Sequence, residues 1–280
     1  MESIEEKYIE VNGVMLHTII AGSGESLILL HGFPDFWYGW NNVIEGLKED
    51  FKLIVPDTRG INLSDKPEGE ENYEIDILAN DIIELSKKLN LGKFTLVGHD
   101  WGGVISYYIA YKYPEYLKKL IICNSSHPAI HREKMKTDDK QRRSGGYLAQ
   151  LMKPGAEESF FRNDMLALKG SVFGTSRRKN AFTEEDKQKY IESWSQPNSI
   201  LNGINYYRAN KYVSKQIGSI EVPTLVIHGM KDNFIRPITL EGLSDYVKDL
   251  KIVKAEKSSH WVMHDAPEIV CSSIREFINP

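Results

Sequence analysis

In the first part of the chain, short apolar runs alternate with longer segments in which apolar residues recur at helical spacing. The runs Ser26–Leu30, Phe94–Val97 and Lys119–Cys123 predict buried strands, and the spacing over Asp76–Leu89 and Trp101–Tyr113 predicts helices. Further strands are predicted at 8–10, 15–20 and 52–55, the first two joined by a turn at Asn12-Gly13. Strands that alternate with helices predict a mostly parallel α/β sheet covered by helices on both faces.

The pattern changes after Asn124. Residues 127–213 contain no apolar run typical of a strand, and they are charged, helix-prone and interrupted by Gly145-Gly146, Pro154-Gly155, Gly174 and Pro197. Strands return at 223–228 and 250–255, and a helix over Pro267–Ile278 closes the chain. We therefore expect an α/β core of residues 1–126 and 214–280, and a helical cap domain of residues 127–213. Because this insert starts at the edge where open parallel sheets bind ligands, we expect it to cover the site.

Composition restricts the function classes. The 280 residues carry a net charge of −4, without the basic surplus of a nucleic-acid-binding protein. The basic cluster of Lys134–Lys136 with Arg142 and Arg143 is interpreted as a solvated helix face. Cys123 and Cys271 are too few and too distant for a disulfide framework or a zinc site.

The N-terminal segment Met1-Glu-Ser-Ile-Glu-Glu6 lacks the basic start and apolar stretch of a signal peptide. No apolar run approaches the roughly 20 residues that span a bilayer. We therefore expect a cytoplasmic protein that does not enter a membrane.

The segment Gly98-His-Asp-Trp-Gly-Gly103 lies between a predicted strand and a predicted helix. It has the form of a nucleophile elbow, Gly-x-nucleophile-x-Gly, with Asp100 where serine is usual. Glycines fit the tight turn, and the helix N-terminus favours an anion by roughly 0.3–1 kcal/mol. The alternative is that Asp100 only caps the following helix.

A nucleophile on such an elbow needs a base and an orienting acid, in the chain order nucleophile, acid, histidine. Asp232 follows the strand 223–228, and His260 follows the strand 250–255. Taken singly, Asp232 could be a turn residue and His260 a structural histidine, but three strand ends in the required order favour a triad. No acid follows the strand that ends at Cys123, where Asn124 and Ser125 stand.

An oxyanion site is expected where two loops meet. The loop His31-Gly32-Phe33-Pro34 can direct the backbone N–H of Phe33 toward the same point as the N–H of Trp101, the residue after Asp100. The histidines outside the proposed triad show no metal-ligand spacing, so we expect neither a metal nor another cofactor.

Several motifs resemble the epoxide hydrolases of the α/β-hydrolase superfamily. They are His31-Gly-Phe-Pro-Asp-Phe-Trp-Tyr-Gly-Trp40, Asp57-Thr-Arg-Gly60 with Leu63-Ser-Asp-Lys-Pro67, Gly98-His-Asp-Trp-Gly-Gly103, Ile204-Asn-Tyr-Tyr-Arg208 and His260-Trp261. The resemblance covers nearly the whole chain and is thinner within the insert. We expect a substrate pocket that includes His31, Pro34, Asp35, Trp37 and Trp261.

The related dehalogenases share the aspartate nucleophile but differ at two points. Haloalkane dehalogenases usually carry Asn after His-Gly, where this chain has Phe33. Haloacetate dehalogenases usually follow the nucleophile with Arg and place a second Arg one turn on, where this chain has Trp101 and Val104. Both differences favour the epoxide hydrolases.

Epoxide hydrolases usually present two tyrosines from the cap as hydrogen-bond donors to the epoxide oxygen. Tyr207 matches one of them. The other normally lies four residues before a proline, and counting back from Pro154 gives Gln150. Tyr147 lies one helical turn earlier and can face the same way, so the second donor is Tyr147 or Gln150, unless Tyr147 is an ordinary packing residue.

The resemblance implies hydrolysis of an epoxide to a vicinal diol through an ester on Asp100, without a cofactor. The partners would be a small apolar electrophile and water, and no oligomeric state follows from the sequence. Two alternatives stay open: a dehalogenase with the same Asp-His-Asp triad, and a ligand-binding protein that uses the covered pocket without turnover. The complete triad disfavours a binding protein, which has no need of His260 and Asp232.

Overall fold

Eight strands form one sheet in the order β1-β2-β4-β3-β5-β6-β7-β8 in the computed structural model, which describes residues 4–279. The strands are β1 (Glu5–Val11), β2 (Val14–Ala21), β3 (Glu25–Leu30), β4 (Phe51–Pro56), β5 (Phe94–His99), β6 (Leu117–Cys123), β7 (Thr224–Gly229) and β8 (Leu250–Ala255). The pairs β1–β2 and β2–β4 are antiparallel and the other pairs are parallel. The predicted α/β class and every predicted strand are confirmed. The prediction about a signal peptide rests partly on residues 1–3, which lie outside the described residues.

The central strands are apolar on both faces because helices cover both faces. In β3, Leu27 and Leu29 join one hydrophobic cluster, while Ile28 and Leu30 join the other. Successive side chains of a strand point to opposite faces, so an uninterrupted apolar run is what a strand buried on both sides requires.

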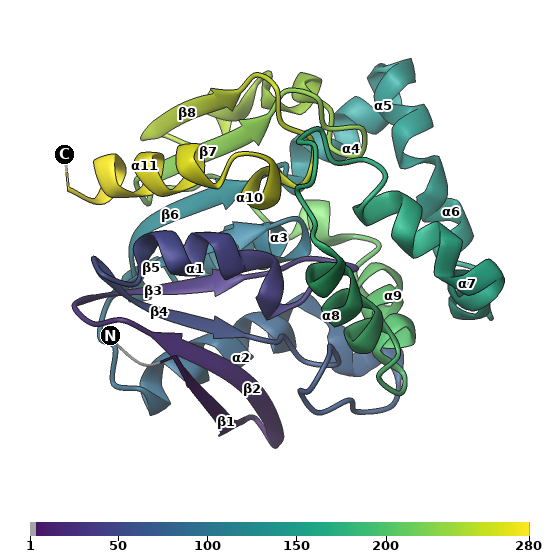
Figure 1. Cartoon of the computed structure of the whole chain (residues 1–280). Helices are drawn as coiled ribbons and strands as arrows, with labels where there is room; N and C mark the ends of the chain where they lie inside the picture. The colour runs from purple at the N-terminus through teal and green to yellow at the C-terminus, as the bar shows by residue number, and fades with distance from the viewer. Residues whose placement is uncertain (1–3, 280) are drawn as a thin grey trace.

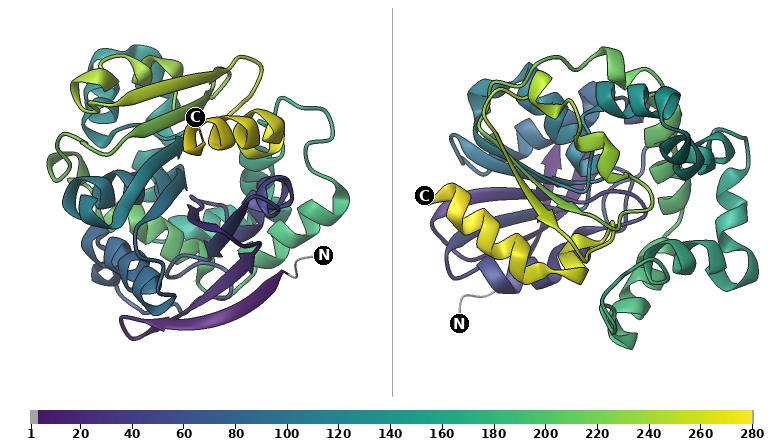
Figure 2. Two further views of the ribbon diagram at one scale, coloured as in Figure 1. Left: turned by 90° about the vertical axis from the view of Figure 1, so that its left-hand side faces the viewer. Right: turned by 90° about the horizontal axis from the view of Figure 1, so that it is seen from above.

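Helices of the core flank this sheet. They are α1 (Asn41–Leu47), α2 (Ile75–Lys88), α3 (Trp101–Lys112), α10 (Val262–Asp265) and α11 (Pro267–Ile278). The view along the strands shows α2 and α3 on one face and α1 with α11 on the other (Figure 2). The helix α1 was not predicted, because its seven residues contain few apolar positions and no side chain caps its start.

The insert between β6 and β7 is helical, as predicted. It comprises α4 (Pro128–Thr137), α5 (Asp139–Ser144), the 3-10 turn η4 (Gly145–Tyr147), α6 (Leu148–Leu151), α7 (Ala156–Val172), α8 (Glu184–Trp194) and α9 (Ser199–Ala209). Pro154-Gly155, Gly174 and Pro197 lie between its helices, and Gly145-Gly146 lies in η4. These helices lie beyond the arrowheads of the parallel strands (Figure 1). The division into a core and a cap domain at residues 127–213 stays a prediction.

None of the helices within residues 4–279 is both long and apolar enough to cross a membrane.

Candidate active site

Asp100 lies on a sharp turn between β5 and α3. Its backbone has φ 49° and ψ −118°, a conformation that residues other than glycine rarely adopt. The turn needs glycine on both sides: a Cβ on Gly98 would lie 2.3 Å from the carbonyl oxygen of Gly102, and a Cβ on Gly102 would lie 2.3 Å from that of Leu30. The Asp100 side chain makes no capping hydrogen bond to α3, so the alternative of a simple helix cap is wrong.

Two backbone N–H groups approach this carboxylate. The N–H of Phe33 donates to Oδ1 of Asp100 at 3.0 Å, and the N–H of Trp101 also interacts with the carboxylate. Gly32 allows the loop after β3 to come this close, because a Cβ there would lie 2.3 Å from the Cβ of Asp100. The two N–H groups expected to form an oxyanion site thus meet on Asp100, and Oδ2 is left facing His260.

His260 and Asp232 line up behind the nucleophile. Nε2 of His260 lies 3.6 Å from Oδ2 of Asp100, and Nδ1 of His260 lies 2.8 Å from Oδ2 of Asp232. The other oxygen of Asp232 accepts hydrogen bonds from the N–H groups of Phe234 and Ile235, at 2.7 and 2.9 Å. The structure therefore brings together three residues that are separated by up to 160 positions along the chain.

Burial and mutual charge set the protonation of these groups. Burial raises the pKa of Asp100, and the charge of His260 with the N–H groups of Phe33 and Trp101 only partly offsets it. Burial opposes protonation of His260, but Asp232, followed by Asp100 and Asp35, outweighs it and raises the pKa of His260. Burial likewise acts against the charge of Asp232, yet His260 keeps the pKa of Asp232 below its ordinary value. This arrangement favours a charged Asp232 that stabilises a protonated His260.

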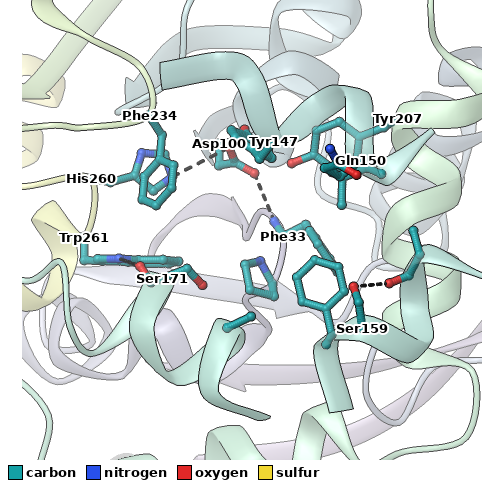
Figure 3. Close-up of a pocket in the computed structure, with 15 residues that line it drawn as sticks. Phe33, Asp100, Tyr147, Gln150, Ser159, Ser171, Tyr207, Phe234, His260 and Trp261 are labelled. Atoms are coloured by element: carbon teal, nitrogen blue, oxygen red, sulfur yellow. Dashed lines mark hydrogen bonds and ion pairs between the residues drawn. The ribbon is translucent and has the colours of Figure 1, made fainter. Parts of the chain in front are cut away.

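An apolar cavity lies above Asp100. It has a volume of about 300 Å³, and its walls include Phe33, Pro34, Phe160 and Trp261. Figure 3 shows Asp100, His260 and the cap residues Tyr147, Gln150 and Tyr207 around this space. The remaining lining residues are Tyr147, Gln150, Leu151, Ala156, Ser159, Ala167, Ser171, Tyr207 and Phe234. Pro34 and Trp261 thus lie where the sequence predicted them.

Three residues expected in the pocket lie elsewhere, so that part of the prediction is wrong. His31 accepts a hydrogen bond from the N–H of Thr58 at 3.0 Å, and Trp37 packs against the ring of His17 with centroids 6.4 Å apart. Asp35 is buried below the cavity, where it accepts hydrogen bonds from Tyr190 at 2.8 Å and from the N–H of Phe36 at 2.9 Å. Burial raises the pKa of Asp35 to about 7. The sequence motif groups these residues with Phe33 and Pro34, but the hydrogen bonds and packing of their side chains lie outside the cavity.

The three candidate hydrogen-bond donors of the cap all line the cavity. Tyr207 comes from α9, Tyr147 from η4 and Gln150 from α6. The Tyr147 and Tyr207 side chains interact with each other, and burial followed by the charge of Asp100 raises the pKa of Tyr147. Burial also raises the pKa of Tyr207 well above its ordinary range, so both hydroxyls keep their protons.

Sequence reasoning missed one polar residue of the site. Asn124, directly after β6, donates to Oδ2 of Asp232 at 2.7 Å and to the carbonyl of Ser259 at 3.2 Å, and it accepts from the N–H of Gly229 at 3.0 Å. An asparagine at this position cannot serve as the acid of a triad, and no other role for it was predicted. Its location at a strand end, beside the strand that carries Asp232, was the available signal.

Known proteins share this fold. Residues 25–267 match the family described as "alpha/beta hydrolase fold". The chain is 35% identical over 99% of both chains to the AB hydrolase superfamily protein YfhM of Bacillus subtilis. It is 34% identical to epoxide hydrolase 1 of Caenorhabditis elegans, covering 100% of this chain and 71% of that protein. A crystal structure of Bacillus megaterium epoxide hydrolase in complex with an inhibitor superimposes with a TM-score of 0.92 at 34% identity, over 98% of this chain and 100% of that one.

These matches extend over nearly all of the chain, and they include the segments that carry Asp100, Asp232 and His260. The family match and YfhM indicate the superfamily, and the relatives named epoxide hydrolases, at more than 30% identity, indicate the family within it. The chain belongs to the α/β-hydrolase superfamily and, within it, to the epoxide hydrolase family.

Proposed function

We propose that this enzyme hydrolyses epoxides to vicinal diols through a covalent ester on Asp100, beneath a cap formed by residues 127–213. The proposal rests on the different surroundings of the two oxygens of the Asp100 carboxylate. Oδ1 accepts the N–H of Phe33 at 3.0 Å, while Oδ2 faces both the apolar cavity and Nε2 of His260 at 3.6 Å. A carboxylate suits this chemistry because the first step is displacement at an sp³ carbon.

In the first step, Oδ2 of Asp100 attacks one ring carbon and the carbon–oxygen bond on that carbon breaks. The electron pair goes to the former ring oxygen. The hydroxyl of Tyr207 supplies the proton that makes this oxygen a hydroxyl, and Tyr147 or Gln150 is the second hydrogen-bond donor beside it. The product is an ester between Asp100 and the substrate.

In the second step, His260 takes a proton from water and the oxygen of that water attacks the carbonyl carbon of the ester. The charge that develops on Oδ1 is stabilised by the N–H groups of Phe33 and Trp101. Collapse releases the diol as the proton on His260 moves to the departing oxygen, and the acid proton left on Asp100 returns to the tyrosine. Asp232 holds the His260 ring and stabilises its charge, through the 2.8 Å contact.

The relatives support an epoxide over a halide substrate. One structure of the Bacillus megaterium enzyme is of a complex with its product, (R)-3-[1]naphthyloxy-propane-1,2-diol, which is a vicinal diol. At 34% identity over 98% of this chain, that relative makes a small organic epoxide the expected substrate here as well. A hydrolytic dehalogenase would use the same triad, but its usual halide-binding Asn is replaced by Phe33.

A turnover test distinguishes the three functions. Purified enzyme is given styrene oxide, a haloalkane and a haloacetate, and diol and halide are measured separately. Diol from styrene oxide without halide release supports the proposal. Halide release without diol would assign the chain to the dehalogenases, and tight binding without either product would make it a ligand-binding protein.

The ester is tested in a single turnover with enzyme in excess, in water that carries a heavy oxygen isotope. The label is expected in Asp100 and not in the diol, because the water attacks the ester carbonyl. Label found first in the diol would mean that water opens the ring directly.

A further inference from the structure

The turn that carries Asp100 is followed by a further glycine, Gly103, beyond the two that the turn itself needs. A Cβ on Gly103 would lie 2.4 Å from the Cβ of Ser125 and 2.6 Å from its Oγ. Ser125 is buried and lies just after β6, the strand that pairs with β5. Gly103 therefore leaves room for the side chain of Ser125 directly beside the turn.

The hydroxyl of Ser125 uses this room to reach the backbone of the nucleophile. Oγ of Ser125 donates to the backbone carbonyl of Asp100 at 2.8 Å. The same carbonyl accepts the N–H groups of Gly103 at 3.0 Å and of Val104 at 3.1 Å. Those two donors belong to α3, whereas Ser125 follows the neighbouring strand, so Ser125 ties this carbonyl to the sheet as well as to the helix.

The peptide group that Ser125 contacts also carries an N–H of the oxyanion site. A peptide bond is planar, and in its trans form the carbonyl of Asp100 and the N–H of Trp101 point in opposite directions within one plane. That N–H approaches the Asp100 carboxylate. A donor on the carbonyl fixes the tilt of the plane, and it also polarises the peptide group, which strengthens the N–H as a donor. Ser125 can thus act on the oxyanion site through the backbone.

We infer that Ser125 is a positioning residue of the oxyanion site: its hydroxyl orients and polarises the peptide between Asp100 and Trp101. This inference rests on the proposed two-step function and adds a residue to the same site. Because Ser125 acts on the N–H of Trp101, it affects the two steps of the reaction differently.

The difference follows from the charge on Oδ1 of Asp100. This charge disperses while the carboxylate attacks the ring, so a weaker N–H does not slow ester formation and can speed it. The charge returns to Oδ1 when water attacks the ester, so a weaker N–H slows hydrolysis. A side chain that only stabilises the fold has no reason to separate the two steps in this direction.

The test is Ser125→Ala in a single turnover of styrene oxide with enzyme in excess. Rapid quench with intact-protein mass spectrometry follows the formation and the decay of the ester. Formation should keep the wild-type rate or become up to about twofold faster, and decay should become about three- to tenfold slower. This loss is smaller than the roughly 10²–10³-fold that follows removal of a whole oxyanion donor, because the N–H of Trp101 remains. Equal slowing of both steps, or no change in either, would overturn the inference.

A pH series excludes an effect through the catalytic base. Ser125 follows Asn124, whose side chain donates to Asp232, so a substitution at 125 could in principle act on His260. If Ser125 acts on the oxyanion site, the acidic limb of ester decay stays in place in Ser125→Ala and only the plateau falls. A limb that moves would show that Ser125 acts through His260, and the inference would be wrong.

Two further variants separate the hydroxyl from the packing around it. Ser125→Thr keeps the hydroxyl and should keep the ratio of the two rates near that of the wild type. Ser106→Ala is the matched control: buried Oγ of Ser106 donates to the carbonyl of Gly102 at 2.6 Å, but the N–H of that peptide group, on Gly103, bonds to the Asp100 carbonyl and not to the oxyanion. Ser106→Ala should lower stability in urea without changing the ratio.

These variants also separate this inference from the proposed function. A threonine enzyme that decays as slowly as Ser125→Ala, or a Ser106→Ala enzyme with the same altered ratio, would overturn the role of Ser125 while epoxide hydrolysis stands. If the wild type forms neither an ester nor a diol from styrene oxide, the proposed function itself fails.

Discussion

Nδ2 of Asn124 lies 2.7 Å from Oδ2 of Asp232, the same oxygen that faces Nδ1 of His260 at 2.8 Å. Asn124 is fully buried, has a backbone φ of 41°, and is also bonded to Ser259 and Gly229 on the loops that carry His260 and Asp232. Burial opposes the charge of Asp232, and His260 does most to keep the pKa of Asp232 low. His228 and then the hydrogen bond from Asn124 lower this pKa further. Asn124 is thus placed to position the acid and the base with respect to each other.

Asn124→Ala should therefore slow hydrolysis of the ester more than formation of the ester. We expect about a tenfold slower second step, which corresponds to about 1.4 kcal/mol, and a loss of about 1–3 kcal/mol in the free energy of unfolding. Stopped-flow measurement of the two steps, together with urea denaturation, checks both values. Equal slowing of the two steps would reduce Asn124 to a general structural role.

Asn62 offers a matched control. It is also buried, has a φ of 46° and donates to an aspartate, Asp57, at 2.7 Å, but it does not line the cavity above Asp100. Asn62→Ala should lower stability to a similar extent without changing the ratio of the two rates.

His260→Gln should form the ester and fail to hydrolyse it, because the glutamine cannot take a proton from water. Intact-protein mass spectrometry after incubation with styrene oxide should show the mass of enzyme plus substrate, and peptide mapping should locate it on Asp100. His127→Gln is the control: His127 is buried and caps α4, with its Nδ1 accepting the N–H of Ala129 at 3.3 Å. A His260→Gln enzyme that turns over at the normal rate would refute the assignment of the base.

Tyr207→Phe should slow alkylation of Asp100 by about 10²–10³-fold, the loss that follows removal of one oxyanion donor. Tyr147→Phe should have a comparable effect if Tyr147 is the second donor, and Gln150→Leu should have the larger effect if the amide has that role. Tyr206→Phe is the control, because the Tyr206 hydroxyl donates to Thr58 at 2.9 Å and Tyr206 does not line the cavity above Asp100. Rapid-quench measurement of ester formation decides among them, and an unchanged rate in Tyr207→Phe would remove Tyr207 from the mechanism.

The pH dependence of ester hydrolysis should change in Asp232→Asn. His260 acts as a base only when neutral, so the rate rises with pH through the pKa of His260, which Asp232 raises against the opposing effect of burial. Removing that carboxylate lowers the pKa of His260, so the acidic limb should move to lower pH even as the plateau falls by about 10²–10⁴-fold. Decay of the preformed ester, followed across a pH series, provides the measurement. A limb that stays in place or moves to higher pH would show that another acid controls His260.

The sequence alone was sufficient for the sheet and for the principal candidates of the site. Apolar runs and helical spacing report burial directly, because a strand covered on both faces has to be apolar throughout, as in Leu27–Leu30. The elbow around Asp100 could be recognised because its turn tolerates little other than glycine at positions 98 and 102. Asp232 and His260 could be located because the carboxyl ends of parallel strands meet at one edge of the sheet.

The tertiary structure alone decided where side chains point and which residues distant in sequence meet. Trp37 and Pro34 are close in sequence, but only Pro34 lines the cavity, since the direction of a side chain after a turn depends on the packing around it. Asn124 acquires its place beside Asp232 from the pairing of β6 with β7, which joins residues about a hundred positions apart. No local pattern in the sequence encodes a contact of that range.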